Sequence, residues 1–222
     1  MGSKIEPADR FLKVIETYLS LQGEGSHAGL PCFFIRTAVC DLRCIWCDTP
    51  HSWTGGEWMS QDAVLNLVPD HIRLVQMTGG EPLLQKDRVI ELCEAWHMQG
   101  KKTLLETGGH RSLEGLPSYI HIVMDIKLPS SGEAHHPFEV NLQFLKPTDE
   151  IKFVIENRQD FDAALNWIRT HNLTRVCGLL FSPVWGKQSL QDLAAWTLEE
   201  KIDARMQVQL HKIVWGESAT GV

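Results

Sequence analysis

Amphipathic segments recur along the chain between short apolar ones. Residues 89–98 show the pattern best, with apolar side chains at 89, 90, 92, 93, 95, 96 and 98 and polar ones between them. This spacing places the apolar positions on one face of a helix with 3.6 residues per turn. The predicted helices are 60–68, 84–99, 159–171 and 189–201.

The short apolar segments predict strands because they are rich in β-branched and aromatic residues. Apolar residues fill both faces of these segments, and helical segments separate most of them, which is typical of parallel βαβ units. We therefore expect an α/β fold, a partial TIM-type barrel of about six parallel strands. The predicted strands are 32–36, 74–78, 102–107, 120–126, 150–155, 176–181 and 205–210.

Two of the connections between predicted strands, 108–119 and 127–149, contain little helical pattern. We therefore expect the helical coat of the barrel to be reduced on that side. Ligands of such barrels bind at the C-terminal ends of the strands. Motifs rich in glycine or polar residues lie at four such ends, so one shared site is predicted there. They are "MTGGEP" (77–82), "LETGG" (105–109), "MDIKLP" (124–129) and "QLHK" (209–212).

Length and charge narrow the class of protein. With 222 residues and 43% hydrophobic content, the chain can bury one core in a single domain spanning 1–222. Its net charge is 21 − 28 = −7 without any basic run, so we expect no nucleic-acid partner. No apolar stretch approaches the roughly 20 residues of a membrane helix, and the N-terminus lacks the apolar segment of a signal peptide. We expect a cytoplasmic protein, with no membrane partner, whose cysteines are thiols or metal ligands.

Three of the six cysteines, Cys40, Cys44 and Cys47, lie within eight residues and have the spacing C-x3-C-x2-C. Three thiolates suit an iron–sulfur site, in which they hold three irons of a [4Fe–4S] cluster and leave the fourth open to a ligand. Zinc is the alternative, because His51 would complete a Cys3His set in a zinc-stabilised binding module. All four zinc ligands would then crowd one loop, whereas structural zinc usually links two segments.

The cysteine spacing, followed about thirty residues later by "TGGEP" (78–82), resembles the radical S-adenosylmethionine (SAM) superfamily. The resemblance implies the radical SAM fold, a [4Fe–4S] cluster held by the three cysteines, and SAM on its open iron. In that superfamily the glycine-rich turn binds the methionyl ammonium of SAM. Glycines allow a close approach of the backbone, and Glu81 offers negative charge. The residues expected to contact SAM are Thr78, Gly79, Gly80, Glu81, Thr107 and Lys127.

Further motifs resemble the 7-carboxy-7-deazaguanine synthase family of queuosine and 7-deazapurine biosynthesis. They are "LQGEG" (21–25), G-x-P-x-x-F-I-R (29–36), "CDT" (47–49) and "QLHKIVWG" (209–216), in order along nearly the whole chain. The resemblance implies a lyase that contracts 6-carboxy-5,6,7,8-tetrahydropterin to 7-carboxy-7-deazaguanine with loss of ammonia. It also implies assistance by Mg²⁺, a reducing donor such as flavodoxin or ferredoxin, and a homodimer. A radical SAM activase that generates a glycyl radical on a partner protein is the second enzyme interpretation, but it leaves "LQGEG" and "QLHK" without a role.

Residue chemistry suits the implied pterin substrate. Glu24 can accept hydrogen bonds from the donor edge of a pterin, Gln22 can donate and accept, and Arg36 can bind a carboxylate with two parallel bonds. An N-terminal substrate loop (about 18–31), the cluster loop (40–47) and a C-terminal tail (about 211–222) are expected to close the site. The predicted substrate-binding residues are Leu21, Gln22, Gly23, Glu24, Gly25, Arg36 and His211.

The hydroxyl of Thr49 is implied by the resemblance as a ligand of Mg²⁺, with Asp48 supporting the site without contacting the ion. Mg²⁺ takes few protein oxygens and keeps several waters or ligand oxygens, which fits a single hydroxyl. His51 and the pair His135–His136 match no role in the family, and we expect them to be solvated. Cys32, Cys93 and Cys177 lie within predicted strands or helices and are expected to be core thiols.

Overall fold

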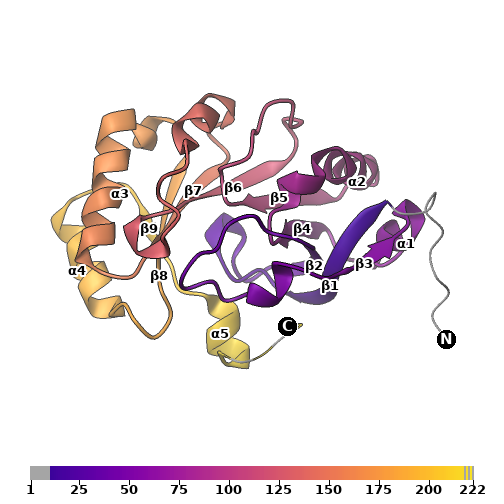
Figure 1. The fold of residues 1–222 in the computed structure, drawn as a ribbon, viewed down its shortest axis with the longest axis horizontal. Helices are drawn as coiled ribbons and strands as arrows, with labels where there is room; N and C mark the ends of the chain where they lie inside the picture. Colours follow the sequence, from indigo (N-terminus) through magenta and orange to yellow (C-terminus); the bar gives the residue numbers. More distant parts are fainter. Residues whose placement is uncertain (1–10, 218, 220, 222) are drawn as a thin grey trace.

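The computed structural model describes residues 11–217, 219 and 221. Positions 1–10 of the predicted domain, and 218, 220 and 222 of the predicted tail, lie outside the described residues. One sheet organises the described chain, in the order β3-β1-β2-β4-β5-β6-β7-β8-β9 (Figure 1). Its strands are β1 (Leu12–Leu21), β2 (Pro31–Thr37), β3 (Glu57–Met59), β4 (Leu74–Gly79), β5 (Lys102–Thr107), β6 (His121–Ile126), β7 (Glu150–Ile155), β8 (Gly178–Pro183) and β9 (Arg205–Met206).

From β2 to β9 in the sheet order, each pair of adjacent strands is parallel. Six of them, β2 and β4 to β8, are six or seven residues long and correspond to the first six predicted strands. The sheet order has two different ends, so the barrel is not closed. The predicted partial TIM-type barrel of about six parallel strands is confirmed.

Strand β1 was not predicted, and it changes the start of the expected substrate loop. It pairs antiparallel with β2, so residues 18–21, expected to be loop, are strand. A register shift between Val14 and Glu16 breaks the alternation of buried and exposed positions, which hides the strand in the sequence. The short strand β3 adds to its far edge.

The predicted strand 205–210 is wrong beyond Met206. Only Arg205 and Met206 pair with β8, and the chain enters a short helix, α5 (Leu210–Trp215). The side chain of Gln207 marks the departure, because it bonds to the hydroxyl of Ser182 and accepts from the backbone of Gly25. The chain leaves the sheet here to bring 209–212 to the mouth of the barrel.

The remaining helices agree with the amphipathic segments: α1 (Gln61–Leu65), α2 (Lys86–Met98), α3 (Arg158–His171) and α4 (Leu190–Glu199). Ser60, Asn157 and Ser189 cap α1, α3 and α4 by accepting a backbone N–H of the first turn. Across the described residues, no helix has the length and apolar character needed to cross a membrane.

The helical coat is reduced, as expected. Within the described chain, the β5–β6 connection contains no helix, and the β6–β7 connection has only 3-10 turns at Pro129–Ser131 and Phe138–Phe144. Figure 1 shows α2 on one flank of the sheet and α3 with α4 on the other.

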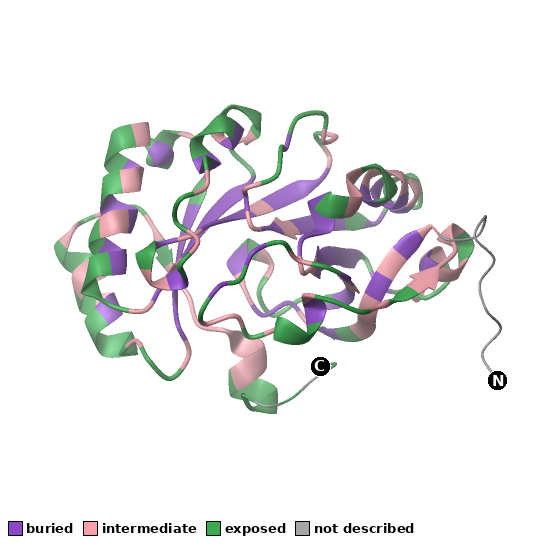
Figure 2. Ribbon diagram, viewed as in Figure 1, coloured by how far each residue is buried: buried purple, intermediate pink, exposed green. Residues whose placement is uncertain are grey.

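Buried residues concentrate along the parallel strands, and the helices alternate buried with exposed residues (Figure 2). Trp96, Phe153, Phe161 and Phe181 are fully buried in the main core, which also contains Cys93 and Cys177. Cys32 lies in a smaller buried cluster with Phe34, Leu74 and Leu104. The expectation that these three cysteines are core thiols is confirmed.

Candidate active site

A cavity of about 510 Å³ opens where the parallel strands end. Its walls come from the strand ends, the cluster loop, the loop after β1 and helix α5. All but one of the predicted site residues line it, and the exception is Gly25. The lining set is Leu21, Gln22, Gly23, Glu24, Arg36, Cys40, Cys44, Cys47, Asp48, Thr49, Thr78, Gly79, Gly80, Glu81, Thr107, Lys127 and His211.

The cluster loop follows the end of β2. Val39, directly before Cys40, has a φ of 75°, which is unusual for a β-branched residue. Its backbone N–H bonds to the carbonyl of Ser52 at 2.9 Å, which closes the loop on itself. The strained position turns the chain so that Cys40, Cys44 and Cys47 all reach the cavity.

The 3-10 turn at Pro129–Ser131 anchors the other side of the cluster loop. Ile45 donates its backbone N–H to the carbonyl of Ser131 at 3.0 Å, and the indole of Trp46 donates to the Ser130 hydroxyl at 3.2 Å. Arg43 donates its backbone N–H to Glu133 at 2.6 Å. The helix-poor β6–β7 connection therefore supports the cysteine loop.

The three thiols line the cavity, and so does His51, the fourth member of the possible zinc set. Nε2 of His51 lies 3.6 Å from the carboxylate of Glu16 on β1. Burial raises the pKa of the Cys44 thiol to about 11, and it also raises that of Cys40, so a bound metal would displace their protons.

The "TGGEP" turn packs directly against the cluster loop. Gly80 and Glu81 donate backbone N–H groups to the carbonyls of Thr37 and Val39, at 3.2 and 2.9 Å. A side chain at Gly80 would overlap the backbone of Val39 and Cys40. The glycine is therefore required by the contact between the two loops, a reason that the sequence pattern does not reveal.

Glu81 is fully buried and bonds within the protein. Its carboxylate accepts from the hydroxyl of Thr107 at 2.8 Å and from the backbone of Leu83 and Gly108, at 2.9 Å each. Burial raises the pKa of this carboxyl, against the effect of its hydrogen bonds. Glu81 therefore joins the turns after β4 and β5.

A network of charged side chains lines the cavity, from β5, β6, β7, the residue after β6 and the loop after β1. The ammonium of Lys152 lies 3.0 Å from Glu24, 3.6 Å from Asp125 and in direct contact with Glu106, and Lys127 lies 3.0 Å from Asp125. Burial opposes the charge on Lys152, but Glu106 and Glu24 raise its pKa well above the usual value. Two cations thus face three carboxylates here.

Arg36 is held by the unpredicted strand β1. Its Nε donates to Glu16 at 2.7 Å, and Nη2 donates to the hydroxyl of Tyr18 at 2.9 Å. Burial opposes the charge on Arg36, whereas Tyr18 and Glu16 raise the pKa of its guanidinium. The Nη1 edge is the part of the guanidinium left for a ligand in the cavity.

The loop after β1 and helix α5 close on each other. The carbonyl of Gly23 accepts from the backbone of Leu210 at 3.1 Å, and a side chain at Gly23 would collide with the imidazole of His211. Burial lowers the pKa of His211 and so favours a neutral ring, whereas the carboxylates of Glu24 and Asp48 act in the opposite direction. The motifs "LQGEG" and "QLHK" therefore form one wall.

Asp48 connects the cluster loop to the same helix. Its carboxylate accepts from Lys212 at 3.0 Å and from Gln209 at 3.3 Å. Burial would raise the pKa of Asp48, but the ammonium of Lys212 lowers it below the usual value. Thr49 follows, with its hydroxyl 3.8 Å from the sulfur of Cys47.

Several residues at the cavity were not predicted as site residues. Glu16 and Tyr18 were missed together with their strand. Gln76 and Lys212 carried a signal, since Gln76 is a polar residue inside an apolar strand and Lys212 belongs to "QLHK". Gly25 lies outside the lining, where its backbone N–H bonds to Gln207 at 2.6 Å.

Comparison with known proteins agrees with this arrangement. Residues 34–195 match the family described as the Radical SAM superfamily. The fold also resembles a solved structure titled "Crystal structure of QueE from Escherichia coli", with a TM-score of 0.75 and 23% identity over 90% of this chain and 94% of that one. The partial barrel and the three-cysteine loop therefore define a radical SAM enzyme, the class that uses a [4Fe–4S] cluster and SAM.

Curated relatives narrow the class. A protein of Koribacter versatilis is 40% identical over 95% of this chain and all of its own length. A second, of Methanospirillum hungatei, is 42% identical over 91% of this chain and 85% of its own. A third, of Chlorobaculum tepidum, is 37% identical over 95% of this chain and 97% of its own length. Each is named 7-carboxy-7-deazaguanine synthase, and this chain belongs to that family.

Proposed function

We propose that the chain contracts 6-carboxy-5,6,7,8-tetrahydropterin to 7-carboxy-7-deazaguanine with loss of ammonia. One observation carries the proposal. The two motifs that distinguish the family, "LQGEG" and "QLHK", meet through Gly23 and Leu210 at a cavity that also contains the three cysteines. A radical SAM enzyme acting on a protein partner has no need of this closed wall. The product is an intermediate of queuosine biosynthesis.

The cysteines have the chemistry to hold a [4Fe–4S] cluster, and their loop faces the cavity. Cys40, Cys44 and Cys47 would hold the cluster, which together with SAM would supply the radical chemistry for hydrogen abstraction from the pterin. We propose that Thr78, Gly79 and Gly80 bind SAM through their backbone and that Lys127 and Thr107 contribute polar contacts. Glu81, with its oxygens already bonded, positions the turn.

The charged residues suit the pterin. Glu24 offers a carboxylate to the donor edge, and the ammonium of Lys152 lies 3.0 Å from that carboxylate. Gln22 lies beside Glu24, whose backbone N–H it accepts at 3.2 Å. The Nη1 edge of Arg36 faces the carboxylate of the substrate, and a neutral His211 closes the site with Leu21 and Gly23.

Magnesium is assigned to Thr49. A hydroxyl oxygen together with the substrate carboxylate is a set that this hard ion accepts while it keeps several waters. Asp48, bonded to Lys212 and Gln209, supports the segment without contacting the ion.

Three further properties complete the proposal. A flavodoxin or ferredoxin reduces the cluster, and Ile45, 73% exposed in the cluster loop, offers such a donor an apolar contact. The protein is a homodimer, for which exposed Leu19 and Leu30 provide apolar surface. It acts in the cytoplasm, where small-molecule SAM and pterin are available.

The test is anaerobic reconstitution with iron and sulfide, followed by incubation with SAM, Mg²⁺, a reductant and the carboxylated pterin. The expected result is about four irons per chain and release of 7-carboxy-7-deazaguanine and ammonia, measured by mass spectrometry. The Cys44→Ala variant should lose SAM cleavage, whereas Cys93→Ala, in the core, should keep its iron.

Other results would favour the alternatives. SAM cleavage without any conversion of the pterin would point to an activase of a partner protein. A colourless protein with one zinc and no iron after reconstitution would support the zinc-stabilised binding module.

A further inference from the structure

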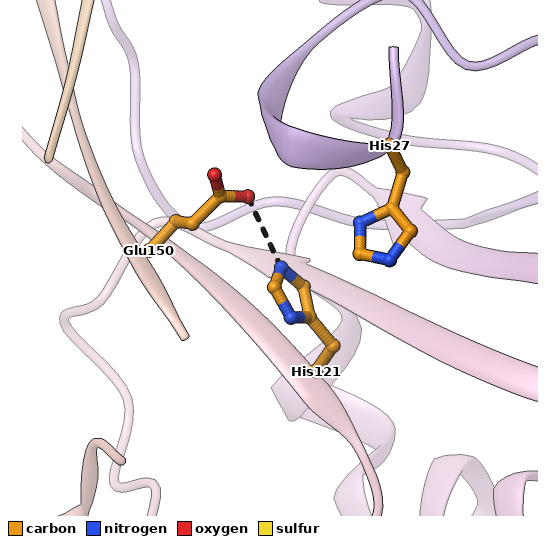
Figure 3. A group of neighbouring side chains, drawn as sticks. All are labelled: His27, His121 and Glu150. Atoms are coloured by element: carbon orange, nitrogen blue, oxygen red, sulfur yellow. Dashed lines mark hydrogen bonds and ion pairs between the residues drawn. The ribbon is translucent and has the colours of Figure 1, made fainter. Parts of the chain in front are cut away.

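Two histidines and a glutamate meet at the opposite end of the sheet from the cavity. His121 is the first residue of β6 and Glu150 the first of β7, whereas the cavity motifs follow the C-terminal ends of the parallel strands. His27 approaches them from the 3-10 turn Gly25–His27 of the loop after β1 (Figure 3). Neither the thiols nor the proposed SAM and pterin residues belong to this group.

Distances within the group suit a single metal ion. The possible ligand atoms of the three side chains all lie within 4.8 Å of one another. Nε2 of His121 is 3.1 Å from a carboxylate oxygen of Glu150. Ligand atoms of a tetrahedral site with bonds of about 2.0–2.1 Å lie about 3.3 Å apart, so these two already have the required spacing. His27, on a half-buried turn, needs only a small approach.

The backbone of the loop after β1 orients Glu150 as outer partners do around bound metals. The backbone N–H of Ser26 donates to both oxygens of Glu150, at 3.0 and 3.2 Å, and such contacts fix metal-binding side chains. Nδ1 of His27 is the ring nitrogen that faces Glu150 and His121 in Figure 3. The hydroxyl of Ser26 lies 3.1 Å from this Nδ1, so it turns aside when the nitrogen binds a metal.

Burial and charge favour the forms that bind a metal. His121 and Glu150 are each 5% exposed. The carboxylate of Glu150 offsets part of the charge of a divalent cation. Two imidazoles and one carboxylate are a donor set that suits zinc and related first-row transition metals, whereas Mg²⁺ prefers oxygen.

We propose that His27, His121 and Glu150 bind one divalent transition-metal ion, with Zn²⁺ as the reference cation. The three ligands come from β6, β7 and the loop after β1, so the ion ties that loop to the floor of the barrel. The same loop carries Gln22 and Glu24. The consequence that the ion steadies the pterin-binding loop rests on the proposed function; the metal site itself does not.

The test is equilibrium dialysis of the cluster-loaded enzyme against Zn²⁺ in excess Mg²⁺, with zinc and iron per chain measured by mass spectrometry. Loss of an outer partner alone weakens metal binding about 10- to 100-fold, so His27→Ala should weaken zinc binding by at least about 100-fold. Glu150→Gln should do the same. Because the side chain of His27 is half-buried, His27→Ala decides the result if Glu150→Gln fails to fold.

Two control variants should keep the zinc. His71→Ala removes an exposed histidine, and His136→Ala disrupts the other group of possible ligands, Glu133, His135 and His136. Diffraction data collected at the zinc edge should place the ion between His27 and His121. The inference is overturned if the cluster-loaded wild type binds no zinc. It is also overturned if His27→Ala binds zinc as tightly as wild type. Neither outcome depends on turnover of the pterin.

Discussion

One side of the Arg36 guanidinium pairs with Glu16, and another side faces the cavity. Glu16 already neutralises its charge through Nε, so a substrate carboxylate gains mainly from the directed N–H groups of the remaining edge. Tyr18 orients that edge from β1. The chemistry of Arg36 could be predicted from its type and its place after an apolar strand. Its two partners could not, because they belong to a strand paired through non-local contacts.

We predict that Arg36→Ala raises the KM for the carboxylated pterin about ten- to a hundred-fold, since a charge-assisted hydrogen bond contributes roughly 1.5–3 kcal/mol. Arg36→Lys should restore only part, because an ammonium cannot make two parallel bonds. The measurement compares the carboxylated pterin with an analogue lacking the carboxylate, and Arg36→Ala should discriminate little between them. Iron content should not change.

Arg88→Ala, at an exposed arginine of α2, is the matched control and should keep normal kinetics. If Arg36→Ala still prefers the carboxylated pterin as strongly as wild type, another cation binds the carboxylate.

Helix α5 shows where element prediction failed. Residues 205–210, "RMQVQL", alternate polar and apolar positions as a strand does. Two contacts far along the chain decide otherwise, because Leu210 bonds to Gly23 and Lys212 pairs with Asp48. By contrast, α2 and α3 bury their own apolar faces against the sheet, so their periodicity sufficed.

We predict that Lys212→Ala loosens α5 without unfolding the barrel. In the ion pair that Lys212 forms with Asp48, the Asp48 side chain is half-exposed. Loss of the pair should therefore lower stability by less than about 1 kcal/mol and kcat/KM by no more than about fivefold. Hydrogen exchange of 210–215 should quicken, while that of β4 to β8 stays unchanged.

Arg169→Ala removes a comparable exposed pair with Glu200, between α3 and α4, and serves as the control. Protection of α5 that is the same in Lys212→Ala and wild type would show that the Gly23 contact alone holds the helix.

At the scale of the whole molecule, the parallel strands were predictable and the edges of the sheet were not. Strands buried on both faces appear in the sequence as continuous apolar runs. The strands β1 and β3, at one side of the sheet, are half-buried or very short, so their positions depend on pairing, and at the other edge only two residues of the predicted strand 205–210 form β9. The site was foreseen as a set of strand-end motifs, but the bonds between them required the fold.

Aromatic packing joins the sheet to α3 and α4, the helices of the C-terminal part of the chain. The ring of Phe161, on α3, lies 5.4 Å from that of Phe181 on β8 and 5.5 Å from that of Trp196 on α4. Phe161 is fully buried, so Phe161→Ala should lower the free energy of unfolding by about 3–5 kcal/mol. Urea denaturation of the metal-free chain measures the change.

Leu198→Ala provides the comparison on α4, because Leu198 is 78% exposed and its truncation should change stability by less than about 0.5 kcal/mol. Equal stability of the two variants would mean that the three rings do not hold the helices to the sheet.

The hydrogen bond between Gly23 and Leu210 also sets an order of events during synthesis. The parallel strands can pair in chain order as they leave the ribosome, and the cysteine loop gains its support once the β6–β7 connection has emerged. The wall formed by the loop after β1 must wait until α5 emerges, because its partner is made 187 residues later (210 − 23). A nascent chain that has already formed its barrel therefore still has an open cavity, and it becomes competent to enclose a substrate only after α5 has been synthesised.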